Sequence, residues 1–389
     1  MMSNPGISIK SIIRYIYKFC VLKLFYPLVY KICSLRKMSP HKAVFIEVRG
    51  LNMSSNFTLI WDELLRREYD CRLHCLGLSS VSGWEGNRRC FGFVRDIADA
   101  GVIFINDGSN ILSSLPLRKE TQVVQTWHAC GAFKRFGLST AEHSYGGSRH
   151  EQTYFHSYKN CDIVTVSSPE VVWAYSEAMD IPKERIKPVG VSRTDVLFDK
   201  YAIDAAVNKV REKMRIPKDK KILLYAPTFR GENARNARPP EFFDADQAIN
   251  LLSDEYFIVI KHHPFIKILP VLPKNNNIDY VPNEITIDEA LMAADLCVTD
   301  YSSLVFEYSL LRRPVYFLAP DIDDYVDERG FYYPFAEFAP GPVVSTTAEL
   351  AQKILGDNFD YNPLDAFRGK FMSACDGQST ERIMELVNL

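Results

Sequence analysis

Three polar turns of this chain carry side chains that can move a proton or hold a phosphate. Each turn follows a short apolar segment, and the turns are Trp127-His128, His262-His263-Pro264 and Asp300-Tyr-Ser-Ser303. A neutral imidazole is a good general base near pH 7. Serine hydroxyls and free backbone N–H groups at the start of a helix are suited to binding phosphate. Together these turns favour chemistry on a phosphate ester.

The third turn lies between a predicted strand and a predicted helix. Leu296–Thr299 is a short apolar run typical of a buried strand, and residues 304–311 follow helical spacing. Asp300, Ser302 and Ser303 stand between them, where the N-terminus of a helix points its N–H groups at an anion. This arrangement predicts a phosphate-binding turn.

The histidines also have ordinary structural interpretations. His128 is either a general base or a structural histidine hydrogen-bonded in its turn, and Cys130 offers a covalent nucleophile as an alternative. Adjacent residues of an extended chain point opposite ways, so we expect only one of His262 and His263 to face the cleft. His263 is favoured because Pro264 fixes its turn. No third ligand stands at suggestive spacing, so we predict no metal site there.

Another predicted strand ends before a polar loop that carries the Thr228 hydroxyl and the Arg230 guanidinium. Arg230 suits bidentate contact with a phosphate, with a solvated loop arginine as the alternative. An acidic patch lies further along the chain. It lacks the residue order of an EF-hand, so we expect a solvated loop at Asp323, Asp324, Asp327 and Glu328.

The composition is that of a globular protein and excludes several functions. A chain of 389 residues with 47% hydrophobic and 24% charged residues suits two domains with full cores. The net charge of −2 provides no overall attraction to nucleic acid. Nine cysteines without a C-x-x-C pair argue against a disulfide framework or structural zinc and favour a reducing setting. The absence of G-x-x-x-x-G-K-[ST] and G-x-G-x-x-G removes P-loop NTPases and weakens dinucleotide enzymes.

Apolar segments and helical patterns alternate after residue 40. The predicted strands are Ala43–Val48, Arg72–Leu76, Gly101–Ile105, Gln122–Gln125, Asp162–Val166, Ile186–Val189, Ile222–Tyr225, Phe257–Ile260, Leu296–Thr299 and Val315–Leu318. The helical patterns among and after them are Phe57–Arg67, Arg88–Ala98, Pro169–Met179, Asp204–Met214, Ala245–Leu252, Thr346–Leu355 and Thr380–Val387. Such alternation predicts parallel sheets covered by helices on both faces.

The turn-rich stretch Gly190–Ala205 divides this alternation into two series. We therefore expect an α/β fold with domains at residues 41–200 and 201–389. Two such domains that face each other place their ligands in the cleft at the carboxyl ends of the strands. All four turns lie at such ends, which predicts a catalytic cleft.

Residues 1–40 differ from the rest of the chain. Ile7–Leu35 is rich in Ile, Tyr, Phe, Leu and Val, but lysine and arginine interrupt it too often for a spanning helix of about 20 apolar residues. The pattern predicts a basic amphipathic helical segment lying in the surface of an anionic membrane. The alternative is a helix packed on the first domain with its lysines in solvent. Pro27 is expected to interrupt or kink the helix.

Taken in order, these motifs resemble those of the CDP-glycerol glycerophosphotransferase family of teichoic-acid and related polymer synthesis. The shared order is more specific than any one motif. The matching segments are Gln125–Gly137, Gly190–Asp195, Leu224–Arg230, His263-Pro264, Thr299–Glu307 and Arg312–Tyr332. One departure is Ala129-Cys130, where many members carry Gly-Thr, and it puts the local acceptor contacts in question.

The resemblance implies a GT-B-like architecture, in which two Rossmann-like domains face each other across a cleft. It also implies transfer of glycerol phosphate or ribitol phosphate from a CDP-alditol to an acceptor hydroxyl, with release of CMP. The implied partners are CDP-glycerol or CDP-ribitol, a lipid-linked saccharide or polyol-phosphate acceptor, and an anionic membrane. The expected location is the cytoplasmic face of the cell membrane, with peripheral attachment.

Roles for individual residues follow from the same resemblance. His128 matches the proposed base and His263 the second essential histidine. His263 and Arg230 are the candidate cations beside the leaving group, and no metal or cofactor is expected. The implied donor-binding residues are Thr228, Arg230, Asp300, Ser302, Ser303, Glu307 and Arg329.

Two rival functions remain open. One is a GT-B glycosyltransferase that uses a nucleotide sugar for a surface polysaccharide. The other is a non-catalytic, membrane-bound partner within a polymer-export assembly, which would tolerate loss of His128. The sequence decides neither glycerol against ribitol nor the addition of one unit against many.

Overall fold

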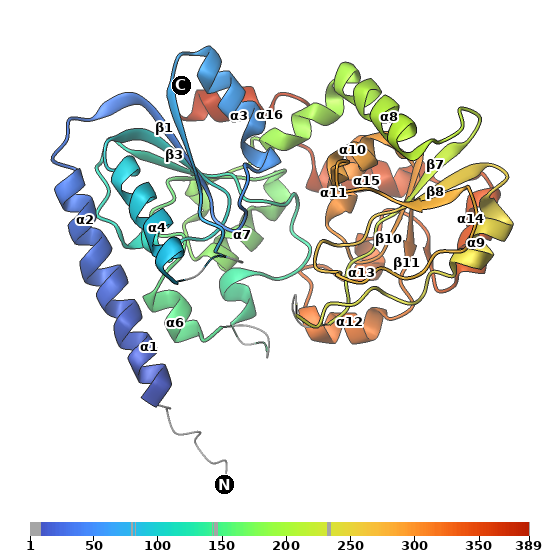
Figure 1. Cartoon of the computed structure of the whole chain (residues 1–389), viewed down its shortest axis with the longest axis horizontal. Helices are drawn as coiled ribbons and strands as arrows, with labels where there is room; N and C mark the ends of the chain where they lie inside the picture. Colours follow the sequence, from blue (N-terminus) through green and yellow to red (C-terminus); the bar gives the residue numbers. More distant parts are fainter. Residues whose placement is uncertain are drawn as a thin grey trace, which may run out of the picture.

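The computed structural model describes residues 9–78, 81, 83–141, 143, 147–231 and 235–388, without the side chains of residues 10, 11 and 326–329. Two α/β domains lie side by side, each built on one six-stranded sheet (Figure 1). Every strand pair within both sheets is parallel. The expected fold, two Rossmann-like domains in a GT-B-like arrangement, is confirmed.

The sheet of the first domain has the strand order β2-β1-β3-β4-β5-β6. Its strands are β1 (Ser39–Glu47), β2 (Asp70–Cys75), β3 (Ala100–Ile105), β4 (Gln122–Gln125), β5 (Ile163–Thr165) and β6 (Ile186–Lys187). Its helices are α3 (Ser55–Arg66), α4 (Gly83–Ile97), α5 (Asn110–Ser114), α6 (Arg149–Tyr154) and α7 (Val172–Met179). The central strands are buried on both faces, as apolar runs between helical layers require.

The sheet of the second domain has the order β12-β11-β10-β7-β8-β9. Its strands are β7 (Lys221–Tyr225), β8 (Tyr256–Ile260), β9 (Ile278–Tyr280), β10 (Leu296–Thr299), β11 (Val315–Leu318) and β12 (Val343–Val344). Its helices are α8 (Lys200–Met214), α9 (Ala245–Leu252), α10 (Ile287–Ala293), α11 (Leu304–Leu310), α12 (Ile322–Arg329), α13 (Phe335–Phe338), α14 (Thr347–Leu355) and α15 (Tyr361–Phe371). The loops after β7, β8 and β10 face the first domain.

The end of the chain returns to the first domain. Helix α16 (Ser379–Leu386) lies beside α3 (Figure 1), and Ile383 and Met384 join the core around Phe45 and Phe57. The predicted second domain, residues 201–389, therefore ends too late. Helical spacing identified α16 itself but carries no information on which of two adjacent sheets the helix covers.

The acidic patch is also different from the expected loop. Asp323 and Asp324 lie in the first turn of α12, where carboxylates interact favourably with the positive end of the helix dipole. These acidic residues therefore lie in a helix and not in the solvated loop expected from their composition.

The N-terminal segment is a continuous helical rod made of α1 (Ile9–Phe19), a π-helical stretch (Cys20–Phe25) and α2 (Tyr26–Cys33). Pro27 stands in the first turn of α2, directly after the π-helical stretch, so the expected interruption is a local change of helix type. Tyr26 and Tyr30 are buried, and α2 packs on α4. Ile7, the first residue of the predicted helical segment, lies outside the described residues. Among the described residues, no helix has both the length and the apolar character needed to cross a bilayer.

Two contacts join the loop after β4 to the second domain. Residues 133–135 pair with residues 330–332: the N–H of Arg135 donates to the Gly330 carbonyl (3.1 Å) and the N–H of Tyr332 to the Phe133 carbonyl (2.9 Å). The Phe133 ring also stacks between aromatic rings of the second domain, with centroids 4.3 Å from Phe331 and 4.1 Å from Phe338. The loop is thus held against the second domain by main-chain hydrogen bonds and by ring stacking.

Gly131 lies against α11 of the second domain. Its φ is +63°, and a Cβ atom there would lie 2.1 Å from the Phe306 ring on α11. Only glycine combines that backbone conformation with that contact.

We predict that Gly131→Ala destabilises the protein by about 3 kcal/mol, from left-handed strain and overpacking together. The matched control is Gly369→Ala in α15, where an added Cβ meets nothing within 4 Å. Alanine there should stabilise by about 0.5–1 kcal/mol. Urea unfolding of both variants measures the difference, and equal stabilities would contradict this account of the interface.

Candidate active site

A strained turn after β4 presents His128. Trp127 is 6% exposed and has φ +57°, a conformation that is rare for a bulky residue. Gln125 holds the turn at both ends, because its Oε1 accepts from the Trp127 N–H (2.9 Å) and its Nε2 donates to the Asp107 carbonyl (3.0 Å). The Trp127 ring packs beside the imidazole of His128, with centroids 4.1 Å apart. A strained backbone conformation that buried contacts hold in place is typical of a functional site.

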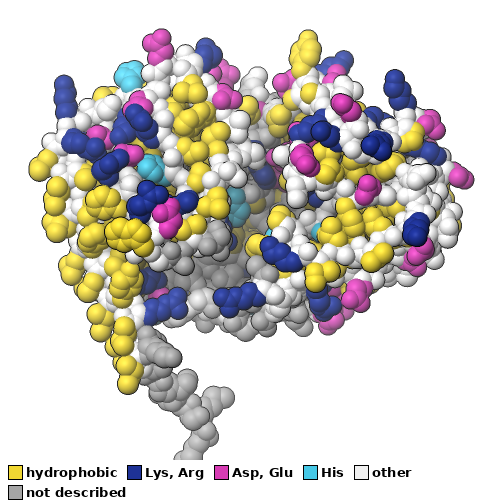
Figure 2. Space-filling model, in the orientation of Figure 1, with side chains coloured by type: hydrophobic (Ala, Val, Ile, Leu, Met, Phe, Trp, Pro, Cys, Tyr) yellow, Lys and Arg dark blue, Asp and Glu magenta, His cyan; other side chains and the backbone are white. Residues whose placement is uncertain are grey.

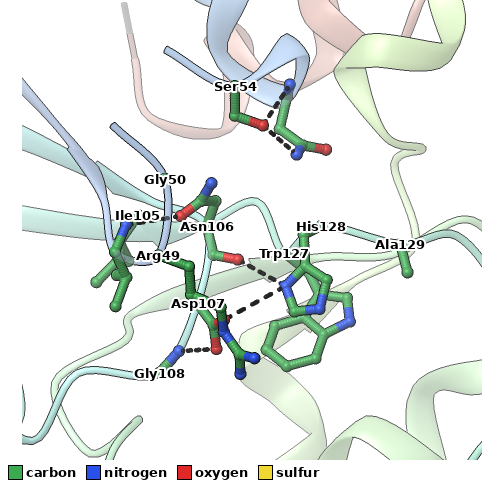
Figure 3. A network of polar contacts seen from close by, with 12 residues as sticks. Arg49, Gly50, Ser54, Ile105, Asn106, Asp107, Gly108, Trp127, His128 and Ala129 are labelled. Atoms are coloured by element: carbon green, nitrogen blue, oxygen red, sulfur yellow. Dashed lines mark hydrogen bonds and ion pairs between the residues drawn. The ribbon is translucent and has the colours of Figure 1, made fainter. Parts of the chain in front are cut away.

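The hydrogen bonds of His128 assign its tautomer. Its Nδ1 lies 3.1 Å from the main-chain oxygen of Asn106 (Figure 3), and a carbonyl can only accept, so Nδ1 carries the hydrogen. The neutral ring therefore has its lone pair on Nε2. With 42% of its side chain exposed, His128 has the form that a general base needs.

Charged groups around His128 set its protonation. The Asp107 carboxylate lies 3.8 Å from Nδ1 and also accepts from the Gly108 N–H (2.7 Å) and from Arg49. Desolvation by the surrounding protein lowers the pKa of His128, Asp107 and the Asn106 hydrogen bond oppose this, and the Arg49 and Arg193 cations add to it. The net effect is a pKa below the usual value, so His128 is neutral at pH 7.

On the second domain, Asp300 organises the ends of β7 and β10. Its Oδ1 accepts from the Thr228 N–H (2.8 Å), and its Oδ2 accepts from the Thr228 hydroxyl (2.9 Å) and Arg230 Nη1 (2.9 Å). Asp300 and Thr228 are both buried. Asp300 thereby fixes the turn that carries Ser302 relative to the turn that carries Thr228.

Arg230 is occupied by this network. Its Nε lies 2.6 Å and its Nη2 3.1 Å from the carboxylate of Asp321, which also accepts from the Tyr301 hydroxyl (2.9 Å). The guanidinium is 7% exposed and lies over the rings of Tyr301 and Tyr325. A cation flanked by two carboxylates has little charge left for a phosphate, so the geometry makes Arg230 a support for Asp300. Its predicted role as a free cation near the leaving group does not fit this placement.

Ser302 and Ser303 form the entrance to α11. Ser302 Oγ accepts from the Leu304 N–H (3.4 Å), whereas Ser303 stands at the N-cap position without a side-chain cap hydrogen bond. Both side chains are partly exposed. Hydroxyls and N–H groups at this position are available to an anion, as expected from the sequence.

His262 and His263 both face the cavity, so the expectation that only one does is wrong. The strand ends at Ile260 and a turn begins at His263, whose carbonyl accepts from the Ile266 N–H (2.9 Å), so the side-chain alternation of an extended strand does not hold here. Burial lowers the pKa of His262 to about 4, and burial together with Lys134 lowers the pKa of His263. Neither is a cation at pH 7, which corrects the predicted charge on His263.

The tautomer of His263 is opposite to that of His128. Its Nδ1 accepts from the N–H of Phe265 (3.1 Å), and an amide N–H can only donate. In the neutral ring the hydrogen is therefore on Nε2. His263 is a hydrogen-bond donor where His128 is an acceptor, so the site has one base and one donor without a net charge on either.

These groups line one cavity of about 460 Å³ between the domains. The surface is hollowed where the domains meet (Figure 2). The chemically important lining residues are His128, Arg193, Thr228, Lys261, His262, His263, Ser302, Ser303 and Glu307. The cavity has the size of a small-molecule site. Asp300 and Arg230 lie behind its wall, and the side chain of Arg329 lies outside the described residues.

A buried ion pair joins the domains at this cavity. Arg193 Nη2 donates to Glu307 Oε1, with side-chain exposures of 16% and 6%. Arg193 Nε and Glu307 Oε2 are buried without a hydrogen-bond partner in the described part of the chain. Such a pair is costly unless its remaining groups are used, so both residues belong to the site.

The structure argues against Cys130 as a nucleophile. The thiol is 2% exposed and is not among the residues lining the cavity. Burial raises its pKa well above the usual range, so it remains a thiol at pH 7.

Two residues of the site, Asp107 and Arg193, were not predicted from the sequence. Asp107 follows the end of β3, as His128 follows the end of β4. This position at a strand end could have identified Asp107 as a site residue. Arg193 lies in the turn motif Gly190–Asp195 and received no role of its own. Its pairing with Glu307 spans the domain boundary, which local pattern does not reveal.

Comparison with known proteins assigns the family. The family described as CDP-Glycerol:Poly(glycerophosphate) glycerophosphotransferase matches residues 28–389. The chain belongs to this family. The resemblance seen in the motifs is confirmed.

Two relatives come from Bacillus spizizenii. The chain is 32% identical over 367 residues to a teichoic acid poly(ribitol-phosphate) polymerase, and 32% identical over 366 residues to a teichoic acid ribitol-phosphate primase. Each match covers 92% of this chain, but 58% of the polymerase and 94% of the primase. The chain therefore spans little more than half the length of that polymerase.

A solved structure shares the fold. The wall teichoic acid polymerase TagF superposes with a TM-score of 0.76 at 24% identity, over 97% of this chain and 96% of that chain. The likeness supports the two-domain architecture.

We predict an acid limb in the pH–rate profile below pH 6.5, the usual pKa of histidine. A base must be unprotonated, so with His128 in that role turnover is full above its pKa and is lost as pH falls through it. Asp107 raises that pKa, so Asp107→Asn should move the limb to lower pH. Asp96→Asn, which alters a carboxylate beside His74 instead, is the control. A limb that moves upward in Asp107→Asn would refute the assignment.

Proposed function

We propose that this protein transfers glycerol phosphate or ribitol phosphate from a CDP-alditol to a hydroxyl of a lipid-linked or polymer acceptor, and releases CMP. The observation that carries this proposal is the pair of neutral histidines with opposite tautomers, His128 and His263, on one cavity beside the Ser302-Ser303 turn. Family membership supports the substrate class.

Each residue has a defined part in the proposed reaction. An acceptor oxygen attacks the phosphorus that bears the alditol, its proton passes to His128 Nε2, and the P–O bond to CMP breaks. The departing CMP is already a good anion, so it requires hydrogen bonds more than a proton. The Nε2–H of His263 and the groups of Ser302 and Ser303 are placed to supply them. The chain's own groups thus provide a base and an anion cradle.

The experiment is CMP release by the purified protein, with CDP-glycerol or CDP-ribitol and a lipid-linked disaccharide acceptor. CMP should form with one donor and only when the acceptor is present. His128→Ala should lower kcat by about two to four orders of magnitude, the range for losing a positioned base, while donor binding survives. Ser302→Ala with Ser303→Ala should instead weaken donor binding. Turnover of a nucleotide sugar, with no CMP from either alditol donor, would refute the proposal.

We also propose that the protein attaches peripherally to the cytoplasmic face of an anionic membrane. The N-terminal rod buries one face on the domain and exposes another, along which hydrophobic side chains gather (Figure 2). The exposed apolar residues of the rod include Ile9, Ile12, Ile13, Ile16, Leu24, Leu28 and Ile32. An apolar stripe among lysines and arginines suits the headgroup region of a bilayer.

Point substitutions test this attachment better than a deletion, because a deletion would also remove Tyr26 and Tyr30 from the core. Ile12→Ser with Ile16→Ser should weaken binding to vesicles of phosphatidylglycerol and phosphatidylcholine by about tenfold, since partly exposed isoleucines lose their insertion energy. The control is Ile268→Ser with Val271→Ser, at 85% and 97% exposure in the second domain. Equal vesicle binding by both variants would rule out the rod as the anchor.

A further inference from the structure

Two adjoining cavities lie beneath the N-terminal rod, outside the cleft between the domains. Their volumes are about 460 and 350 Å³. They share the lining residues Asn110, Thr153, Phe155, His156 and Asp180. Helix α6 lies between the rod and the rest of the first domain at this place (Figure 1). The shared walls make one continuous depression.

The first cavity carries an excess of positive charge. Lys23, Lys159 and Arg185 line it, against the single carboxylate of Asp180 among its lining residues. Lys23 donates to the Tyr154 carbonyl (3.3 Å), and Arg185 to the carbonyls of Lys159 (3.2 Å) and Cys161 (3.1 Å). Carbonyls orient Lys23 and Arg185 without neutralising them. The cavity therefore suits an anion, and phosphate is one that arginine and lysine both bind.

Neutral polar and aromatic side chains surround these cations. The first cavity is lined by Asn110, Ser113, Ser114 and Tyr154, and the second adds Gln152 and Tyr158. Amides and hydroxyls both donate and accept hydrogen bonds, so they match the hydroxyl groups of a sugar. The lining therefore suits a molecule that carries both phosphate and hydroxyl groups.

The second cavity ends one side chain away from the His128 loop. Tyr158 lines it, and the same ring lies 6.1 Å from the ring of Trp127. Gly108, which follows Asp107, approaches Tyr158 so closely that an added Cβ would lie 2.9 Å from its hydroxyl end. The second cavity therefore adjoins the His128 loop through the Tyr158 ring.

The outer end of the first cavity meets the rod. Leu22 and Lys23 line it, and the next residues of the rod, Leu24 and Phe25, are 59% and 50% exposed. Cationic cavity and exposed apolar helix are therefore neighbours. A ligand with an anionic head and a long apolar tail fits both at once.

We propose that the two cavities bind the phosphate-bearing headgroup and first sugar of a lipid-linked acceptor, with its hydrocarbon chain along the rod and its free end directed to His128. This inference rests on the proposed function, since it places the acceptor of that reaction. The acceptor phosphate lies at Lys23, Lys159 and Arg185 and takes no part in the bond exchange.

The first test is steady-state kinetics of the full chain with Lys23→Gln and Lys159→Gln combined. Both lysines are exposed, so folding should survive. The KM for the lipid-linked acceptor should rise about tenfold, from the loss of two charge-assisted contacts. The kcat at saturating acceptor and the KM for the CDP-alditol should stay within about twofold. Lys213→Gln with Lys218→Gln, on the second domain, removes the same charge and should leave all three constants unchanged.

The second test is binding, which needs no turnover. Farnesyl diphosphate and inorganic diphosphate are titrated calorimetrically into wild type and both double variants. Farnesyl diphosphate should bind wild type more tightly than inorganic diphosphate and should lose about tenfold in the Lys23/Lys159 variant only. Equal affinity for both probes would overturn the assignment to a lipid, and unchanged affinity in that variant would overturn the site.

The two tests separate this inference from the proposed function. CMP release with an unchanged acceptor KM in the Lys23/Lys159 variant would refute the cavities as the acceptor site and leave the reaction standing. No CMP release by wild type, with farnesyl diphosphate binding lost in that variant, would refute the reaction and retain a lipid-phosphate site.

Discussion

The contact between Gly131 and the Phe306 ring sets how closely the two domains approach at the cleft. A side chain at position 131 would collide with that ring, so the loop after β4 can lie flat on α11 only with glycine there. Pairing of residues 133–135 with residues 330–332 extends the contact. His128 stands three residues before Gly131, and its position relative to the second domain follows from this contact. His128 and His263 face one cavity because the loop after β4 is held against the second domain.

The cleft keeps its histidines neutral and its arginine paired with a carboxylate. Burial lowers the pKa values of His128, His262 and His263, while the arginines nearest the site are paired with carboxylates. His128 and His263 then differ in tautomer. The Nδ1 of His128 donates to a main-chain carbonyl, whereas the Nδ1 of His263 accepts from a main-chain N–H. In the proposed reaction, a neutral base and a neutral hydrogen-bond donor act on a dianionic diphosphate without first being trapped as ion pairs. The Asp300 network fixes the Ser302-Ser303 turn from behind.

The parallel sheets and the strand-end turns could be predicted from sequence because both follow from local pattern. Buried parallel strands are apolar runs, and polar side chains directly after them must lie at one edge. The strands β4, β10 and β11 and helix α9 have the predicted bounds. The same logic located His128, His263, Ser302 and Ser303 on one cavity.

Other features depend on partners distant in sequence and could not be predicted in the same way. The charge of Arg230 is shared with Asp321, ninety-one residues away, and that of Arg193 with Glu307. The turn after β8 brings both His262 and His263 to the cavity, where an extended chain would not. Helix α16 covers the first sheet because its apolar face meets Phe45 and Phe57 there, a choice between two sheets that its own residues do not encode.

The most direct test of the central claim is a crystal structure of His128→Asn with CDP-glycerol or CDP-ribitol bound. The account predicts the diphosphate at Ser302 and Ser303, with His263 Nε2 within hydrogen-bonding distance of a phosphate oxygen. The alditol phosphorus should face residue 128 across open space for an acceptor oxygen. A diphosphate bound away from this turn, or an alditol phosphorus turned away from residue 128, would contradict the account.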